Sequence, residues 1–143
     1  GVNEVMSKLF RLEILTPERQ VLDRDVEAVT ILAPDGELTV LADHAPLIAT
    51  IDIGRIRLKF DGEWHDAFNS EGFIEVDRDD TVIFTQACEW PEEIDARRAL
   101  EAEKRAEERL RQKQSISEYK QSKIALSRAM ARLRITKSKT GFN

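Results

Sequence analysis

The sequence contains few of the residues on which catalytic and metal sites depend. It has a single cysteine, Cys88, and two histidines that lie far apart, so it can form no internal disulfide and shows neither a metal-ligand pattern nor a catalytic triad. It also has no glycine-rich phosphate loop. We therefore expect a non-catalytic protein that requires no metal, in which Cys88 is a buried small hydrophobic residue.

Long hydrophobic segments are also absent. No apolar run approaches the roughly 18 residues that a membrane-spanning helix requires, and the amino terminus lacks the apolar stretch of a signal peptide. With the lone cysteine, these absences predict a soluble protein of a reducing compartment that does not insert into a membrane. Gly1–Val5 are expected to be a remnant that precedes a natural start at Met6.

Acidic and basic residues are unevenly distributed along the chain. Residues 1–90 contain 8 Lys and Arg against 19 Asp and Glu, a net charge of -11, whereas residues 91–143 contain 14 against 8, a net charge of +6. The last 25 residues contain seven cations and no acid. We expect the two parts of the chain to face different partners.

Residues 9–87 have the pattern of an antiparallel β domain. Short β-branched runs are separated by Gly, Asp and Asn, and in Arg55–Phe60 basic and apolar residues alternate, as in a half-buried strand. Turns are expected at Pro34–Gly36, Asp61–Gly62 and Asp79–Asp80. Strands of this number and spacing predict a sandwich or flattened barrel. The expected strands are Phe10–Leu15, Val26–Ala33, Glu37–Leu41, Leu47–Ile51, Arg55–Phe60, Glu63–Asn69, Phe73–Val76 and Thr81–Ala87.

The part that follows Pro91 predicts two helices. Pro91 itself, with acids behind it, marks a helix start, because proline is tolerated in the first turn and acids favour the positive end of the helix dipole. Two narrow, alanine-rich stripes recur at helical spacing. Buried alanine stabilises far less than buried leucine, so the two helices should pack weakly. The stripes are Ala99, Ala102, Ala106 and Leu110, then Tyr119, Ser122, Leu126, Ala129 and Leu133.

The connection between these helices permits two arrangements. Gln112–Ser117 contains no Gly or Pro that would force a break, yet Ser115 and Glu118 match the capping box that starts a new helix. A folded hairpin and a nearly continuous helix are then close in free energy, and a ligand that favours one of them sets the population. The alternative is a static helical hairpin.

These patterns predict an α+β chain with a clear domain order. We expect an antiparallel β-sandwich over residues 8–89 and a regulatory αα-hairpin over residues 90–136. Residues 1–7 and 137–143 are expected to be flexible termini.

Three ordered segments resemble a known family. Gly36–Leu47, Glu71–Val76 and Ile94–Ala99 are similar, in order and spacing, to the epsilon subunit of the bacterial F-type ATP synthase, over nearly all of residues 9–133. The resemblance implies a β-sandwich of about ten strands with a carboxy-terminal αα-hairpin, which agrees with the strand and helix patterns. It also implies a central-stalk subunit, peripheral on the cytoplasmic face of the cell membrane.

The resemblance further implies partners and an inhibitory role. The sandwich is expected to bind the gamma subunit and the c-ring, and the helical tail to extend into the catalytic alpha/beta head and block ATP hydrolysis. Arg128, Arg132 and Arg134 are the expected contacts with the beta subunit, because an acid-free basic run complements acidic loops. A solvated helix face is the alternative interpretation of this run.

An ATP-sensing motif is implied as well. Ile94, Asp95, Arg98 and Ala99 match the family pattern Ile/Leu-Asp-x-x-Arg-Ala, and ATP bound there would favour the folded hairpin and relieve inhibition. Folding would bring four arginines together, an arrangement that a polyanion stabilises. In the alternative, Asp95 caps the helix and the arginines form weak surface pairs with nearby glutamates. By the resemblance, the other residues that line the site are Glu89, Arg105, Arg128 and Arg132.

Contacts with the c-ring are implied for Glu37 and His44. His44 is expected to be a pH-sensitive contact, with an ordinary turn residue beside a proline as the alternative. Asp43 departs from the family, whose loop commonly has glycine at this position.

A nucleic-acid-binding or other interaction module is the alternative class for a basic-tailed chain. The tail has only Tyr119 and Phe142 as aromatics, however, and the attached acidic domain would repel phosphates. We expect no nucleic-acid partner.

Overall fold

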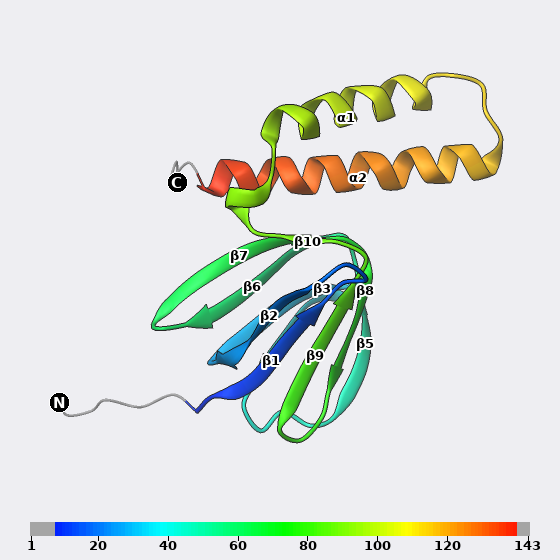
Figure 1. Ribbon diagram of the computed structural model, residues 1–143. Coiled ribbons are helices and arrows are strands. Elements are labelled where there is room, and N and C mark those ends of the chain that lie inside the picture. The colour runs from blue at the N-terminus through cyan, green and yellow to red at the C-terminus, as the bar shows by residue number, and fades with distance from the viewer. Residues whose placement is uncertain (1–7, 140–143) are drawn as a thin grey trace.

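Alternating apolar and polar residues build ten strands, which form two stacked sheets with a helical hairpin across one end (Figure 1). This computed structural model describes residues 8–139. The strands are β1 (Phe10–Leu15), β2 (Gln20–Val26), β3 (Ala28–Ala33), β4 (Gly36–Leu41), β5 (Leu47–Ile51), β6 (Gly54–Phe60), β7 (Glu63–Asn69), β8 (Gly72–Val76), β9 (Asp80–Thr85) and β10 (Cys88–Glu89).

Each sheet contains five strands, in the orders β2-β1-β9-β8-β5 and β10-β7-β6-β3-β4. Neighbouring strands are antiparallel except for β1 and β9, which pair in parallel with Leu12 opposite Thr81. The predicted β-sandwich followed by a helical hairpin is confirmed.

Two strand predictions were incomplete. The single strand expected over Val26–Ala33 is broken, because β2 ends at Val26 and β3 begins at Ala28, while the backbone N–H of Glu27 donates to Lys59 O at 2.8 Å. The last expected strand ends at Thr85, and the short strand β10 follows it.

The core lies between the two sheets. Side chains that alternate along each strand meet there, and the largest of them, such as Leu12, Ile56 and Ile83, have no exposed surface. Cys88 is 3% exposed within the same cluster, and burial raises the pKa of its thiol to about 12. The prediction that Cys88 is a buried hydrophobic residue is confirmed.

Close packing at the β8 end of the sandwich requires a glycine. A Cβ atom on Gly72 would lie 1.9 Å from the carbonyl oxygen of Phe84 on the neighbouring strand. No larger residue fits at this position, directly after the turn between β7 and β8, without moving a strand.

The hairpin begins later than expected. Pro91–Glu93 form a separate 3-10 turn, and helix α1 (Ala96–Leu110) starts only after Asp95, whose carboxylate accepts a hydrogen bond from the backbone N–H of Arg98 at 3.2 Å. Asp95 is thus the N-cap of α1, so the predicted helix start at Pro91 was wrong by one turn.

Helix α2 (Ile116–Lys139) starts at the predicted capping box. The backbone N–H of Glu118 donates to Ser115 Oγ at 3.2 Å, and that of Ser115 donates to a Glu118 carboxylate oxygen at 3.0 Å. The helix runs to Lys139, three residues beyond the expected end of the hairpin at 136. The rest of the predicted flexible termini, residues 1–7 and 140–143, lies outside the described residues.

Small residues form the contact between the helices. Ala99 and Ala106 of α1 and Ala129 of α2 are at most 5% exposed, as the alanine stripes predicted. Tyr119 is 45% exposed, so its assignment to the buried stripe was wrong. No leucine or isoleucine of α1 is buried, and the interhelical contact is therefore weak.

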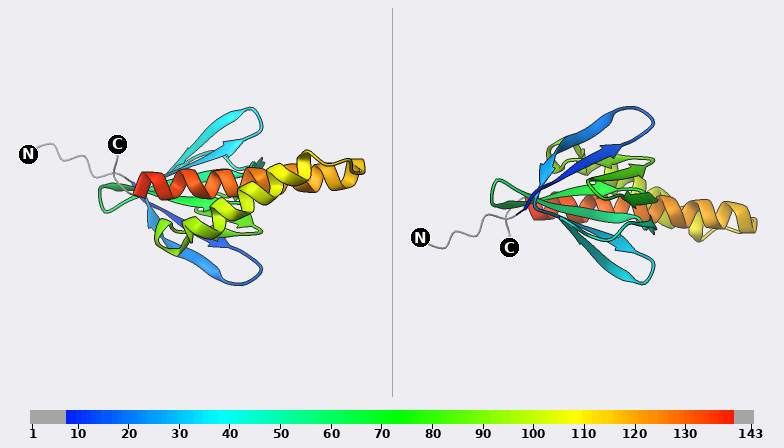
Figure 2. Two further views of the ribbon diagram at one scale, coloured as in Figure 1. Left: turned by 90° about the horizontal axis from the view of Figure 1, so that it is seen from above. Right: turned by 90° about the horizontal axis from the view of Figure 1, so that it is seen from below.

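The hairpin rests on the sandwich at one end only. Ala131 and Ile135 pack on Phe68 of β7, which has no exposed surface. Seen from above, the tip of the hairpin projects past the sandwich (Figure 2). The attachment thus depends on the second half of α2.

Candidate functional site

A polar pocket of about 320 Å³ lies where the hairpin joins the sandwich. This volume is at the lower end of the range of small-molecule sites. Its lining contains three arginines and three acids, so a polyanion must compete with carboxylates already present. The pocket is lined by Glu89, Glu93, Asp95, Arg98, Ala99, Ala102, Arg105 and Arg132.

Helix α1 supplies two arginines to this pocket. Arg98 and Arg105 lie seven residues apart on the same face of the helix and both line the pocket. Within residues 8–139, neither guanidinium group has a hydrogen bond or an ion pair. These two groups are therefore available to an anionic ligand.

The third arginine is already paired. Arg132 of α2 donates from Nε and Nη2 to the two carboxylate oxygens of Glu89 at 2.8 and 2.9 Å. Its guanidinium carbon also lies 4.3 Å from the ring centroid of Phe68. This bidentate, stacked arrangement fixes Arg132 at the wall of the pocket.

Glu93 is held by the sandwich. Arg19 donates to both of its carboxylate oxygens, at 2.7 and 2.8 Å, and the backbone N–H of Trp90 donates to one of them at 2.8 Å. The hydrogen bonds from Arg19 lower the pKa of Glu93, with partial burial opposing them. Arg19 therefore ties the start of the hairpin to the loop between β1 and β2.

The structure brings together six of the eight residues expected to bind ATP, namely Glu89, Asp95, Arg98, Ala99, Arg105 and Arg132. Ile94 lies outside the lining and packs in the cluster around Phe68. Arg128 also lies outside it, so the expected convergence of four arginines was wrong for Arg128. The capping role of Asp95, weighed as an alternative, is also present.

Arg128 instead binds Glu71, in the turn between β7 and β8. Its Nη2 lies 2.8 and 2.9 Å from the two carboxylate oxygens, and its Nε lies 3.3 Å from the first. Partial burial of Glu71 opposes its ionisation, but the hydrogen bonds from Arg128, a backbone hydrogen bond and the positive charge of Arg128 together outweigh burial and lower the pKa of the carboxyl group. The alternative of weak surface pairs with Glu101, Glu103, Glu107 or Glu108 is thus wrong for Arg128, as it is for Arg132.

Acid is expected to loosen the hairpin. The pKa values of Glu71 and Glu93 lie below the ordinary value of 4.5 in the folded protein, so their stabilising effect is complete above that value and is lost as the pH falls through the lower, folded-state pKa. Hydrogen exchange of the α2 amides, measured between about pH 6 and pH 3, should show faster opening at the acid end. A Glu71→Gln protein with an unchanged acid response would contradict the contribution of this carboxylate.

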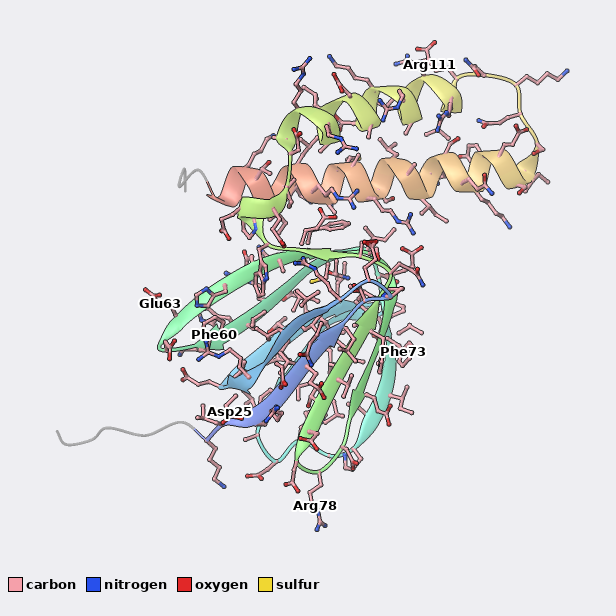
Figure 3. The ribbon with its side chains drawn as sticks, in the orientation of Figure 1. Asp25, Phe60, Glu63, Phe73, Arg78 and Arg111 are labelled. Atoms are coloured by element: carbon pink, nitrogen blue, oxygen red, sulfur yellow. The ribbon has the colours of Figure 1, made fainter. Side chains whose placement is uncertain are left out.

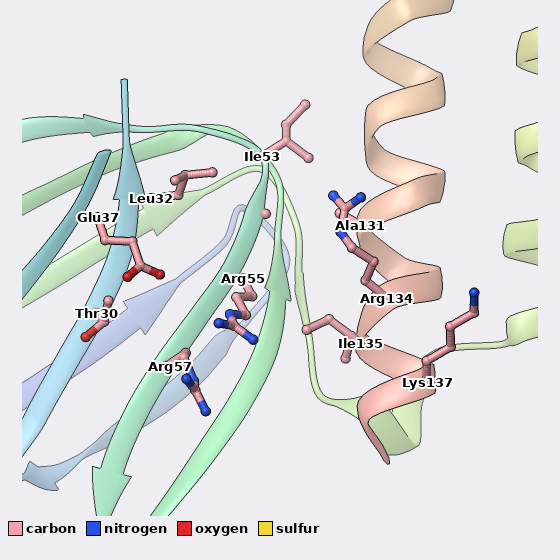
Figure 4. A pocket seen from close by; sticks show the side chains of 11 residues that line it. Thr30, Leu32, Glu37, Ile53, Arg55, Arg57, Ala131, Arg134, Ile135 and Lys137 are labelled. Carbon is pink, nitrogen blue, oxygen red and sulfur yellow. The ribbon is translucent and has the colours of Figure 1, made fainter. Parts of the chain in front are cut away.

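A second cleft, of about 540 Å³, lies between the outer face of β3, β4 and β6 and the end of α2 (Figure 4). Glu37 lines it from the sheet and Arg134 lines it from the helix, together with Arg55 and Arg57. Within residues 8–139, Arg134 has no ion pair or hydrogen bond from its side chain.

The two residues expected to contact the c-ring are not close together. Glu37 lies near the hairpin, whereas His44 lies beyond the other end of β4, where its Nδ1 is 2.7 Å from Ala45 O. Asp43 adopts a left-handed backbone with φ of 67° and pairs with Lys8 at 2.9 Å. Aspartate tolerates this conformation, which explains how it replaces glycine in the loop.

An exposed apolar face on the other sheet was not identified from the sequence. Phe73 is 42% exposed and stacks on Phe84 with ring centroids 5.0 Å apart, and Ile48 nearby is 73% exposed. Phe73 points away from the sandwich (Figure 3). The alternation in β8 was a usable signal, because it leaves Phe73 on the face opposite the buried Ile74.

Among residues 8–139, no group of three or more His, Cys, Asp or Glu side chains is arranged to hold a metal ion. No helix in that range is both long and apolar enough to span a membrane.

A β-sandwich with a weakly packed helical hairpin and an arginine-lined pocket at their junction defines a two-domain protein. Two family profiles match it. The ATP synthase delta/epsilon chain beta-sandwich domain matches residues 9–91, and the delta/epsilon chain long alpha-helix domain matches residues 92–137. The chain therefore belongs to the delta/epsilon chain family of ATP synthases.

Individual relatives agree with this assignment. The ATP synthase epsilon chain of Caldanaerobacter subterraneus subsp. tengcongensis is 48% identical over 131 residues, which cover 91% of this chain and 95% of that protein. The epsilon chain of Ruminiclostridium cellulolyticum is 47% identical over 127 residues, covering 89% and 95%. A chain in the Euglena gracilis mitochondrial ATP synthase structure, OSCP/F1/c-ring, has a TM-score of 0.76 at 22% identity, covering 98% and 86%, and shows the same fold.

Membership makes the protein a non-catalytic subunit of an ATP synthase, as the resemblance implied. Family membership also excludes the alternative class, a nucleic-acid-binding module.

Proposed function

We propose that this chain couples the gamma subunit to the c-ring in the central stalk, and that its hairpin is an ATP-controlled inhibitor of ATP hydrolysis. The protein would then lie on the cytoplasmic face of the cell membrane as a peripheral part of the complex. The observation that carries the proposal is the pocket at the base of the hairpin, whose lining comes from both helices and from the sandwich.

Such a pocket exists only while the hairpin is folded. Arg98 and Arg105 come from α1, Arg132 from α2 and Glu89 from β10. Extension of the tail would separate these elements, so a ligand that contacts all of them binds the folded state alone. Its binding free energy then shifts the population toward the folded hairpin.

Inhibition is supported by the state of the basic residues on α2. Arg128 and Arg132 are neutralised by Glu71 and Glu89 of the sandwich in the folded hairpin. Extension would release both guanidinium groups toward an acidic partner such as the beta subunit, which Arg134 would also contact. The same arginines therefore have two alternative sets of carboxylates, one in each state.

The sandwich offers separate surfaces for its two rotor partners. The apolar face around Phe73 and Ile48 suits the gamma subunit, because exposed aromatic and aliphatic side chains of this kind mark protein interfaces. His44 and Glu37 lie at opposite ends of β4, so a c-ring that contacts both must extend along this strand. A contact at Glu37 would also lie beside Arg134 of the folded tail.

Arg98→Ala is expected to weaken ATP binding by about tenfold or more, since a charged hydrogen bond is worth roughly 1.5–3 kcal/mol. Calorimetric titration of the isolated protein with ATP measures this effect. Arg97→Ala is the matched control, because Arg97 is 87% exposed and, within residues 8–139, pairs only with Glu101 on its own helix. Unaltered affinity in Arg98→Ala, or equal losses in both variants, would contradict a nucleotide site at this pocket.

A further inference from the structure

We infer that the ion pair between Glu71 and Arg128, here called the clasp, holds α2 on the sandwich in the absence of nucleotide. Glu71 is then a positioning residue, which keeps Arg128 out of the polar pocket at the base of the hairpin, the proposed nucleotide pocket. The inference deepens the proposed function and rests on it for the role of the pocket. The resemblance implies that Arg128 is a nucleotide ligand, whereas this inference makes it part of the clasp.

The geometry of this pair is that of a specific contact. Both carboxylate oxygens of Glu71 accept from Nη2 of Arg128 at 2.8 and 2.9 Å, with Nε at 3.3 Å. The two side chains are only 43% and 36% exposed. A multiply hydrogen-bonded, half-buried arginine–carboxylate pair is stronger than an ordinary surface pair.

The backbone on either side of Glu71 is rigidly held. The N–H of Ser70 donates to Ala87 O at 2.9 Å, and Ser70 Oγ accepts from the N–H of Ala87 at 2.7 Å. On the other side, Gly72 lies too close to Phe84 for any side chain. Glu71 is therefore presented from a fixed turn, and little of its backbone freedom is lost when it pairs.

The clasp stands beside the pocket without entering it. Arg128 and Arg132 are four residues apart on one face of α2, and each pairs with a different acid of the sandwich. Of these two ion pairs, only the pair of Arg132 and Glu89 lines the nucleotide pocket. A ligand bound among Arg98, Arg105 and Arg132 would leave the pair of Glu71 and Arg128 intact.

This arrangement has a regulatory consequence. The two pairs neutralise Arg128 and Arg132 in the folded state, so the sandwich competes with any acidic partner for the same guanidinium groups. The pair at Glu71 does so whether or not nucleotide is bound, and therefore sets the resting population of the folded hairpin, while nucleotide adds a further shift.

A double-mutant cycle tests the clasp in the full-length protein. Glu71→Gln, Arg128→Gln and the double variant should each speed exchange of the α2 amides in nucleotide-free protein by the same factor, about threefold to tenfold. ATP affinity should fall by no more than that factor, equally in all three. Glu75→Gln is the matched control, because Glu75 is an exposed acid of β8 that has no ion pair within residues 8–139.

Two results would overturn the inference. One is a much larger loss of ATP affinity in Arg128→Gln than in Glu71→Gln, which would make Arg128 a nucleotide ligand. The other is unchanged α2 exchange in Glu71→Gln without nucleotide. If even the unmodified protein binds no ATP, the proposed nucleotide switch fails, while the exchange cycle still confirms or refutes the clasp.

Discussion

The Phe68→Ala protein is expected to retain a folded sandwich and to lose the docked hairpin. Phe68 has no exposed surface and packs on Ala131 and Ile135, and its ring lies under the guanidinium group of Arg132. Removing a buried phenylalanine costs about 3–5 kcal/mol, which is large beside the few small side chains that hold the hairpin. Hydrogen exchange should show loss of protection throughout α2, with protection of β1 and β9 retained.

Phe73→Ala is the control for this change. Phe73 is also an aromatic residue of the sandwich, but it is 42% exposed and stacks on Phe84, away from the hairpin. Its removal should leave α2 protection unchanged. Full protection of α2 in Phe68→Ala would show that the clasp and the remaining pairs hold the hairpin without this cluster.

Ending the chain after Gln114 is expected to raise ATP hydrolysis by the assembled ATP synthase. The shortened chain lacks α2 and with it Arg128, Arg132 and Arg134, which are the proposed contacts with the catalytic head. An increase of about fivefold or more corresponds to the lower end of typical coupling free energies. Steady-state hydrolysis by the purified complex measures the change.

A chain that ends after Lys139 is the matched control, because it retains all of α2. It should leave hydrolysis at the level of the full-length protein. Unchanged hydrolysis in the chain that ends after Gln114, with the complex still assembled, would remove the inhibitory role of the tail.

Much of the fold could be predicted because its signals are local. Alternation in β6 defined a half-buried strand, and the capping box of Ser115 and Glu118 marked the start of α2 without any knowledge of tertiary contacts. The alanine stripes likewise identified Ala99, Ala106 and Ala129 as the helix contact.

The elements of the fold that could not be predicted depend on contacts with residues that are distant in the sequence. Strand β2 contains Asp23, Arg24 and Asp25, which interrupt the alternation, and it is stable because it pairs with β1 at the edge of a sheet. The parallel pairing of β1 with β9 joins residues about 70 positions apart, so no local pattern indicates it.

The lining of the pocket likewise combines residues related by local spacing with residues whose position depends on distant contacts. Arg98 and Arg105 both line the pocket because they lie seven residues apart on one face of α1, and Asp95 lines it as the N-cap of the same helix. Arg128 was misplaced because its partner is Glu71, 57 residues away in a turn of the sandwich, and only the docking of α2 brings the two together.

Titration of the full-length protein with ATP, and separately with ADP, tests the central claim most directly when hydrogen exchange is followed from Ile94 to Leu133. We expect saturable ATP binding that slows exchange in both α1 and α2, since the pocket is complete only when the hairpin is folded. The ADP titration shows how much of the effect depends on the third phosphate. Absence of ATP binding, or binding that leaves α2 exchange unchanged, would contradict a nucleotide-controlled hairpin.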